Sequence, residues 1–305
     1  MNKLKISQAK IKIPTEPPAI DTPDWLPTKL HALVFAAAAR GSGKTVAVSN
    51  MLRMYRDADL AHKILVLCPT KDSNKYLWEG MVDDEDWYIE PTHNTVRTIL
   101  TKLEKLSDEW QQWKKHMDLY KRFHAAQDIS DLTDDFLIEC LEAGILDSDE
   151  PPTYFAGTAP LPCVHLVCDD VQSTEILHPS SKNVLLHLAI LHRHFARRMG
   201  VSLYFLTQNM SGQSAGIPKA IRQNISCTLL WGCRDISQFQ KMSDEFGLEI
   251  DADTLMQVYR YATQGSKHDF MCCDWSRGQF RKCFDEIIDV NAFKNNKAVK
   301  TDKKI

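Results

Sequence analysis

The chain has 305 residues, 44% of them hydrophobic, and a formal net charge of −3 at pH 7. This length and apolar content are enough for one large domain, or one domain with an insertion, and the charge excludes a globally basic surface for nucleic acid. The nine cysteines include no C-x-x-C pair, which argues against a zinc site or a disulfide framework, and no apolar run approaches the roughly 20 residues of a membrane span.

The N-terminal part is predicted to be an arm followed by a buried strand. Residues 1–28 contain five prolines and no long periodic run, which is typical of an extended segment. The next run, His31–Ala39, has the apolar character of a strand in a parallel sheet covered on both faces. A helical pattern follows at Thr45–Tyr55.

The residues between this strand and this helix have the pattern of a phosphate-binding loop. A glycine turn at the start of a helix presents backbone N–H groups to a β-phosphate. Lys44 can reach the β/γ oxygens, and the Thr45 hydroxyl can ligate Mg²⁺, although Ala38 stands where the full motif has its first glycine. The predicted nucleotide-binding residues are Arg40, Gly41, Ser42, Gly43, Lys44 and Thr45.

A second strand, a long helix and an acidic segment come next. Lys63–Cys68 is a predicted buried strand, and residues 94–128 carry a heptad stripe of apolar side chains that indicates one long helix. This helix either packs its stripe on the domain's own sheet or protrudes to contact a neighbouring subunit or partner. Residues 131–150 are acidic and contain no base, which predicts a solvated surface insertion.

Two adjacent acids follow the third predicted strand. Cys163–Cys168 is a buried-strand pattern, and Asp169 and Asp170 come directly after it. In this position Asp169 would hold Mg²⁺, directly or through water, and Asp170 would orient or deprotonate the attacking water. Two acids at a strand end are also common in a plain turn; the phosphate loop upstream favours the catalytic interpretation.

One helix and two more strands complete the predicted central sheet. A helix capped by Ser180 or Ser181 is predicted to run to about Met199. The fourth and fifth strands are predicted at Val201–Leu206 and Ile225–Trp231.

Three polar residues near these strands are candidates for catalysis. Gln208 follows the fourth strand, and its amide can donate to a phosphoryl oxygen while it accepts from water. Arg197 and Arg222 precede the fourth and fifth strands. Either arginine could act across a subunit boundary as an arginine finger, or could contact solvent or DNA phosphates instead. The sequence does not decide between them.

The last part of the chain is predicted to hold a helix at 252–262, strands at 268–274 and 279–284, and a polar, lysine-rich tail. Strands that alternate with helices predict an α/β fold with a mostly parallel central sheet and helices on both faces. We expect an arm at 1–28, a nucleotide-binding domain at 29–290 with a helical insertion at about 92–158, and a basic tail at 291–305.

Together these motifs resemble the FtsK/HerA-type genome-packaging ATPases of large DNA viruses and virophages. The resemblance covers roughly residues 28–285. Its more specific parts are the glutamine after the fourth strand and the box Ile217–Asn224, which reads Ile-Pro-Lys-Ala-Ile-Arg-Gln-Asn. It implies a P-loop NTPase of the additional-strand, RecA-like type.

The resemblance also implies a function and partners. It implies a ring of identical subunits, six by expectation, that hydrolyses ATP with Mg²⁺ and drives duplex DNA into a preformed capsid. A capsid or membrane vertex protein would be a partner, and the site of action would be the host cytoplasm or nucleus, or the virion. DNA would be held through its phosphates without sequence readout, with Lys219, Arg281 and Lys282 as candidate contacts.

Other functions remain open from the sequence. A P-loop kinase of a small molecule shares the phosphate loop, although the paired aspartates and Gln208 argue against it. A pump for plasmid transfer or chromosome segregation shares the motor chemistry. A nucleotide-gated scaffold protein with a slow site is a third, non-enzymatic alternative.

Overall fold

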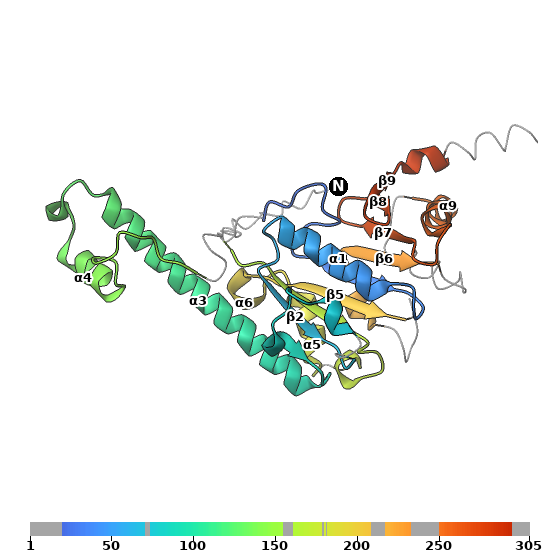
Figure 1. Ribbon diagram of the computed structural model, residues 1–305, viewed down its shortest axis with the longest axis horizontal. Coiled ribbons are helices and arrows are strands. Elements are labelled where there is room, and N and C mark those ends of the chain that lie inside the picture. Colours follow the sequence, from blue (N-terminus) through green and yellow to red (C-terminus); the bar gives the residue numbers. More distant parts are fainter. Residues whose placement is uncertain are drawn as a thin grey trace, which may run out of the picture.

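A mixed β-sheet forms the centre of the molecule. The computed structural model describes residues 20–70, 74–154, 161–178, 180, 182–208, 217–232 and 250–294. Within these residues the sheet has nine strands in the order β3-β2-β4-β5-β1-β6-β7-β8-β9 (Figure 1). Residues 1–19 of the predicted arm and 295–305 of the predicted tail lie outside this part of the chain.

Six strands are parallel and three are antiparallel. The parallel strands are β1 (Leu33–Ala37), β2 (Lys63–Leu67), β3 (Trp87–Tyr88), β4 (Val164–Asp169), β5 (Ser202–Thr207) and β6 (Cys227–Trp231). The antiparallel strands are β7 (Phe270–Asp274), β8 (Gln279–Lys282) and β9 (Glu286–Ile288). The prediction of a mostly parallel α/β sheet is therefore confirmed, and β7–β9 extend it on one side.

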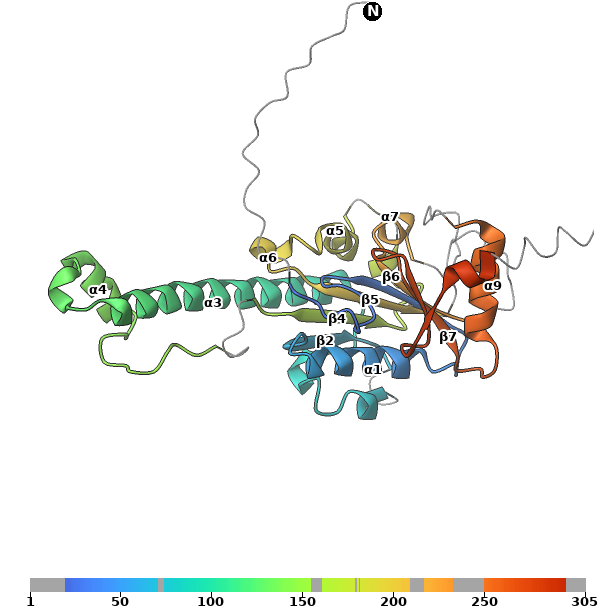
Figure 2. The ribbon, with the colours of Figure 1, turned by 90° about the horizontal axis from the view of Figure 1, so that it is seen from above.

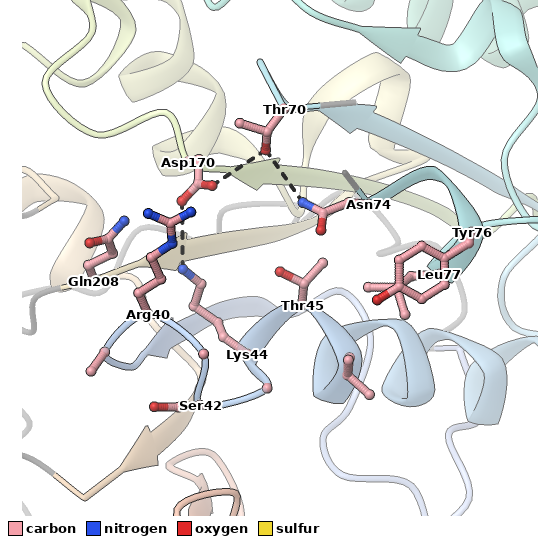
Figure 3. Close-up of a pocket in the computed structure, with 14 residues that line it drawn as sticks. Arg40, Ser42, Lys44, Thr45, Thr70, Asn74, Tyr76, Leu77, Asp170 and Gln208 are labelled. Carbon is pink, nitrogen blue, oxygen red and sulfur yellow. Dashed lines mark hydrogen bonds and ion pairs between the residues drawn. The ribbon is translucent and has the colours of Figure 1, made fainter. Parts of the chain in front are cut away.

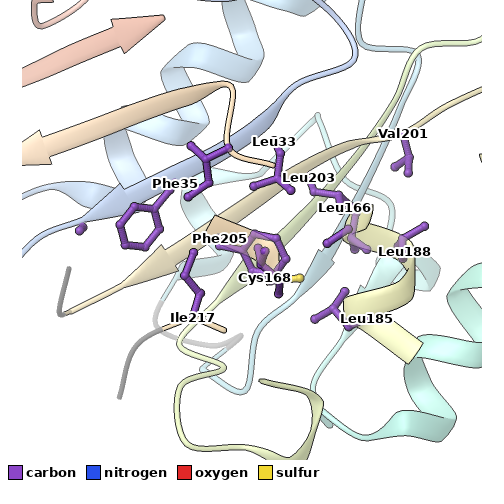
Figure 4. Close-up of a cluster of buried hydrophobic side chains, with 14 of the residues drawn as sticks. Leu33, Phe35, Leu166, Cys168, Leu185, Leu188, Val201, Leu203, Phe205 and Ile217 are labelled. Atoms are coloured by element: carbon purple, nitrogen blue, oxygen red, sulfur yellow. The ribbon is translucent and has the colours of Figure 1, made fainter. Parts of the chain in front are cut away.

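Helices cover both faces of the sheet (Figure 2). The helix α1 (Lys44–Asp57) packs on one face together with Val34 and Ala36 of β1. On the other face Leu33 and Phe35 of the same strand meet further helices, because side chains alternate across a strand (Figure 4). These helices are α3 (His93–Ala125), α5 (Val184–Leu191), α7 (Lys219–Arg222) and α9 (Ala252–Thr263). The shorter elements are α4 (Asp134–Glu142), α6 (Phe195–Arg198), η1 (Lys75–Leu77), η2 (Asp84–Asp86), η3 (Ile129–Asp131) and η4 (Glu175–Leu177).

The long helix α3 packs on the domain's own sheet in its first part and protrudes from the domain in its second part (Figure 1). Its first part packs Val96, Ile99 and Leu103 into the main core. Its second part extends away from the sheet, and there Leu119 packs with Phe136 of α4 in a small separate cluster (Figure 1). The acidic segment thus forms the end of a helical projection. Contact of this projection with another subunit stays a prediction.

The prediction of one helix at 180–199 is wrong, because the helix starts later and the segment is divided into α5 and α6. The buried side chain of Asn183 accepts from the backbone N–H of Leu186 at 3.0 Å and therefore caps α5, which begins at Val184. The helix α5 ends at Leu191, and within α6 Ala196 and Arg197 have positive φ angles of 49° and 53°, so the segment up to Met199 is not one continuous helix.

The end of the predicted arm is packed onto the domain. Leu26 is fully buried, and the guanidinium of Arg281 donates to the carbonyl oxygens of Asp24 and Trp25, each at 2.8 Å. Residues 20–28 are therefore not a free arm. The suggestion that Arg281 contacts DNA is wrong, because its side chain is buried and its guanidinium binds the carbonyl oxygens of this segment. Lys282 is ion-paired with Asp269 at 3.2 Å.

No helix in the described ranges is long and apolar enough to cross a bilayer.

Candidate active site

The loop between β1 and α1 has the backbone of an anion-binding turn. Gly41 and Gly43 have φ angles of +77° and +90°, a left-handed region that side chains with a Cβ rarely adopt. Gly43 is the N-cap residue, so α1 begins at Lys44 and no acidic side chain occupies its first turn. The N–H groups at the start of a helix have no partner within that helix and carry the positive end of its dipole. The turn can therefore bind a phosphate group.

Lys44 lies close to both predicted aspartates, and Figure 3 shows its ion pair with Asp170. Its Nζ is 3.8 Å from Oδ1 of Asp169 and 3.8 Å from Oδ1 of Asp170. The Thr45 hydroxyl donates to Oδ2 of Asp169 at 2.8 Å, although the two residues are 124 positions apart in the chain. The structure thus brings the phosphate loop and both acids together at the carboxyl edge of the parallel strands.

The environment of Asp169 is suitable for binding a cation. It is 2% exposed, and burial raises its pKa, while Lys44 and the Thr45 hydroxyl oppose that rise. Its buried Oδ1 accepts no hydrogen bond from any described residue. Mg²⁺ prefers carboxylate and hydroxyl oxygens and usually keeps several waters, so Thr45 and Asp169 are suitable residues to hold it.

Asp170 is more exposed and differently held. Its φ of +53° is a conformation in which aspartate and asparagine are enriched among non-glycine residues. Its Oδ2 accepts from the Thr70 hydroxyl at 3.5 Å, and Thr70 in turn accepts from the Asn74 amide at 3.4 Å (Figure 3). A carboxylate with one side open to solvent and one side held by Lys44 can orient a water molecule.

The phosphate loop, Lys44, Thr45 and Asp170 line one cavity of about 510 Å³, and Asp169 lies buried next to Lys44 and Thr45. The cavity also contains Gln208, which directly follows β5. Since β5 lies between β1 and β4 in the sheet, Gln208 ends between the phosphate loop and the paired aspartates. A strand inserted at this position separates additional-strand P-loop proteins from those in which the two motif strands are neighbours. The chain has the fold of an additional-strand P-loop NTPase.

The two arginines do not join the cavity of this P-loop fold. Neither of them is among the described residues that line it. Arg197 precedes β5, at the opposite edge of the sheet from the phosphate loop, and pairs with Asp108 at 3.0 Å where both side chains are exposed. Arg222 donates to the carbonyl oxygen of Ile217 at 2.7 Å. A finger that acts on a neighbouring subunit need not lie in its own cavity, so both roles stay predictions.

Several residues of the site were missed by sequence reasoning. Asn74 and Tyr76 line the cavity from the segment after β2. His268 reaches the phosphate loop from the far end of the sequence, with its Nδ1 3.2 Å from the carbonyl oxygen of Ser42. Thr70 follows a predicted strand, and this position is the only sequence signal that could have indicated Asn74 and Tyr76 nearby. No pattern in the sequence indicates His268.

Comparison with known proteins gives similar folds and no close relative. No protein-family model matches the sequence, and no curated protein matches it at a significant level. Solved structures similar to this chain include the genome packaging NTPase B204 from Sulfolobus turreted icosahedral virus 2 in complex with AMP, with 10% identity and a TM-score of 0.45 over 82% of this chain and 96% of that one. EssC (ATPases 2 and 3) from Geobacillus thermodenitrificans has 12% identity and a TM-score of 0.46, over 85% of this chain and 38% of that one. The pCW3 conjugation coupling protein TcpA has 13% identity and a TM-score of 0.40, over 90% of this chain and 65% of that one.

Proposed function

We propose that this chain is an ATPase that translocates duplex DNA and packages a viral genome into a preformed capsid. The observation that carries the ATPase part is that Lys44 of the phosphate loop lies 3.8 Å from both Asp169 and Asp170, at a cavity that Lys44 and Asp170 line. The DNA and capsid parts rest on the motif resemblance, in particular on Gln208 and the box Ile217–Asn224.

The residues of the site divide the work of phosphoryl transfer. The N–H groups of the loop and the Lys44 ammonium bind the β- and γ-phosphate oxygens. Thr45 and Asp169 would hold Mg²⁺, which would neutralise charge on the phosphates. Asp170 orients the attacking water and accepts its proton, and the Gln208 amide contacts the γ-phosphate and that water.

The proposed assembly is a homo-oligomeric ring, a hexamer by the resemblance, with duplex DNA in its pore. Such a ring would meet a capsid or membrane vertex protein, in the host cytoplasm or nucleus or in the virion. Non-specific contacts to DNA phosphates would make binding weaken as salt rises.

ATP hydrolysis in the presence of long duplex DNA tests the motor function. We expect the steady-state rate to rise when the DNA is added and the rise to shrink with added salt, because the contacts are to phosphates. The Lys44→Ala protein, purified in parallel, controls for contaminating ATPases. A rate that DNA leaves unchanged, together with phosphate transfer to a small molecule, would favour a kinase.

Electron microscopy with a non-hydrolysable ATP analogue and DNA would show whether a closed ring forms.

Subunit mixing tests the arginine fingers. We expect Arg197→Ala or Arg222→Ala to bind ATP but to turn it over on the order of 10³-fold more slowly, because the charge that stabilises the transition state is lost. Mixing the inactive variant with Asp170→Asn subunits should restore activity at interfaces that combine an intact acid with an intact arginine.

For Arg197 the chain offers a matched control. Asp108→Asn removes the ion-pair partner and leaves the arginine in place. If the arginine acts only through that pair, the two variants should behave alike. If neither arginine variant loses rate, the finger lies elsewhere.

A further inference from the structure

The end of the helical projection has a core of its own. Its buried side chains pack together apart from the two cores on the sheet, and they are Leu119, Phe136, Cys140 and Ile145. The segment that returns from the projection is tied to α3 by hydrogen bonds. Nε1 of Trp113 donates to the carbonyl oxygen of Pro152 at 2.9 Å. The Tyr120 hydroxyl donates to that of Asp149 at 2.8 Å. The projection is therefore preorganised before any partner binds.

The outer face of α4 combines apolar and acidic side chains. Ile138 and Leu141 are 53% and 59% exposed and lie one helical turn apart. Three exposed acids stand three or four positions from Ile138, and they are Asp134, Asp135 and Glu142. We call these five residues the acidic knob. Residues 128–150 contain nine acids and no lysine, arginine or histidine. The base nearby, Arg122 of α3, lies over the ring of the buried Phe136 and so on the inner side of α4.

A surface of opposite charge lies where α5 ends. Two apolar and two basic side chains are exposed there in one short stretch, and they are Ile190, Leu191, Arg193 and His194. We call these four residues the basic patch. Ile190 and Leu191 are 46% and 51% exposed. Residues 178–200 contain four lysines or arginines and no acid. Asp108, an exposed acid that faces this segment from α3, is paired with Arg197 at 3.0 Å. The patch therefore complements the knob in charge and is apolar like it.

Within one chain the two surfaces stay apart. Ser107 of α3 donates to the carbonyl oxygen of Ala196 at 2.7 Å, which places the basic patch beside the inner part of α3. Leu119, in the core of the projection, is twelve positions further along the same helix, and twelve helical residues span about 18 Å. Figure 2 shows α4 at the outer end of α3 and α5 beside its inner part. Since a continuous helix does not fold back, the partner of each surface has to come from another chain.

We propose that the acidic knob of one subunit docks on the basic patch of the next subunit. The inference rests on the proposed function, because it takes the chain to assemble into a ring. The contact removes apolar side chains of both surfaces from water and sets charges of opposite sign against each other. Knob and patch are different surfaces, so the contact is heterologous, and its repetition closes a ring when the rotation between subunits allows it. Each subunit then uses both of its surfaces.

Crosslinking between two differently altered proteins tests the contact directly. One protein carries Ile138→Cys in the knob and the other carries Ile190→Cys in the patch, and both positions are exposed, so the fold should tolerate the changes. The proteins are mixed with a non-hydrolysable ATP analogue and duplex DNA. We expect a short bismaleimide to join them and mass spectrometry to map the link to these two positions.

Three controls belong to this experiment. Each cysteine variant alone should give no such link, because the contact joins a knob to a patch. Wild-type protein reports any link through the native cysteines. Ile287→Cys, at an exposed position of β9 outside both surfaces, replaces Ile190→Cys in the matched mixture and should give no link to the knob.

Charge reversal tests the pairing of opposite charges. We expect Glu142→Lys or Arg193→Glu to raise the protein concentration needed for half-maximal assembly on the order of tenfold, because like charges then meet. Mixing the two variants should restore assembly to within about threefold of the wild type. In an alternating ring each altered knob meets an altered patch of opposite charge, and each native knob meets a native patch. Glu90→Lys, the same change at an exposed position before α3, should assemble like the wild type.

Sedimentation and electron microscopy of the same samples separate this contact from the proposed function. Rings that form without a link between the two cysteine variants would overturn the contact and leave the proposed ring in place. Charge variants that do not recover on mixing would overturn the opposition of charge on which the docking depends. A protein that stays monomeric with the ATP analogue and DNA would overturn both the contact and the ring.

Discussion

Replacement of Lys44 by alanine is expected to abolish ATP turnover, with a loss of at least roughly 100- to 1,000-fold. The Nζ of Lys44 lies 3.8 Å from each of the two aspartates, beside the helix N-terminus where the phosphates are expected. Alanine removes the charge that stabilises the transferring phosphoryl group. It also leaves the buried carboxylate of Asp169 with the Thr45 hydroxyl as its remaining described side-chain partner, which should raise the pKa of Asp169 further.

Two controls show whether such a loss belongs to the site. Lys114→Ala removes a lysine from the projecting part of α3, far from the loop, and should keep the wild-type rate. A thermal melt of Lys44→Ala should show a single cooperative transition, as expected of a folded domain. DNA-stimulated hydrolysis that survives in Lys44→Ala would refute the assignment of the site.

Asp170→Asn is expected to separate nucleotide binding from hydrolysis. Asparagine adopts the left-handed conformation as readily as aspartate, so the backbone at φ +53° should not change. The amide cannot accept a proton from water, and general-base catalysis typically contributes 10²–10⁴-fold, so we expect a rate at least about 100-fold lower with ATP binding retained. Single-turnover hydrolysis and calorimetric binding measure the two effects separately.

The matched control for the lost charge is Asp149→Asn, which removes an acid from the helical projection and should leave both quantities unchanged. If Asp170→Asn hydrolyses ATP at the normal rate, another group activates the water. If the protein still performed its biological task without hydrolysis, a nucleotide-gated scaffold would be the better description.

Much of the sheet and of the phosphate site could be predicted because the signals are local. Buried parallel strands are apolar along their length, so β1, β2, β4, β5 and β6 were each found within a few residues. The loop was found because Gly41 and Gly43 supply the positive φ angles that its turn requires. The strands then placed Thr45 and Asp169 in contact, since carboxyl ends of parallel strands meet at one edge.

Errors arose where burial, and not residue type, decides the role. Arg281 looked like a DNA contact because exposed arginines bind phosphates, yet it is 4% exposed and holds the segment that precedes β1. The start of α5 was misplaced because three polar residues could cap it, and the bonds of the Asn183 amide to Ile176 and His178 made the choice. Such contacts form only after distant elements have packed.

By itself, the amino-acid sequence determined the chemistry of the nucleotide site, because a glycine turn, a lysine, a threonine and two strand-end acids each act through their own backbone position and side chain. The tertiary structure alone decided that His268 and Phe284 flank the loop, that half of α3 leaves the core, and that Arg281 is buried. The physical reason is that these outcomes depend on which surfaces exclude water together, and this depends on residues more than two hundred positions apart, as in the contact between His268 and Ser42.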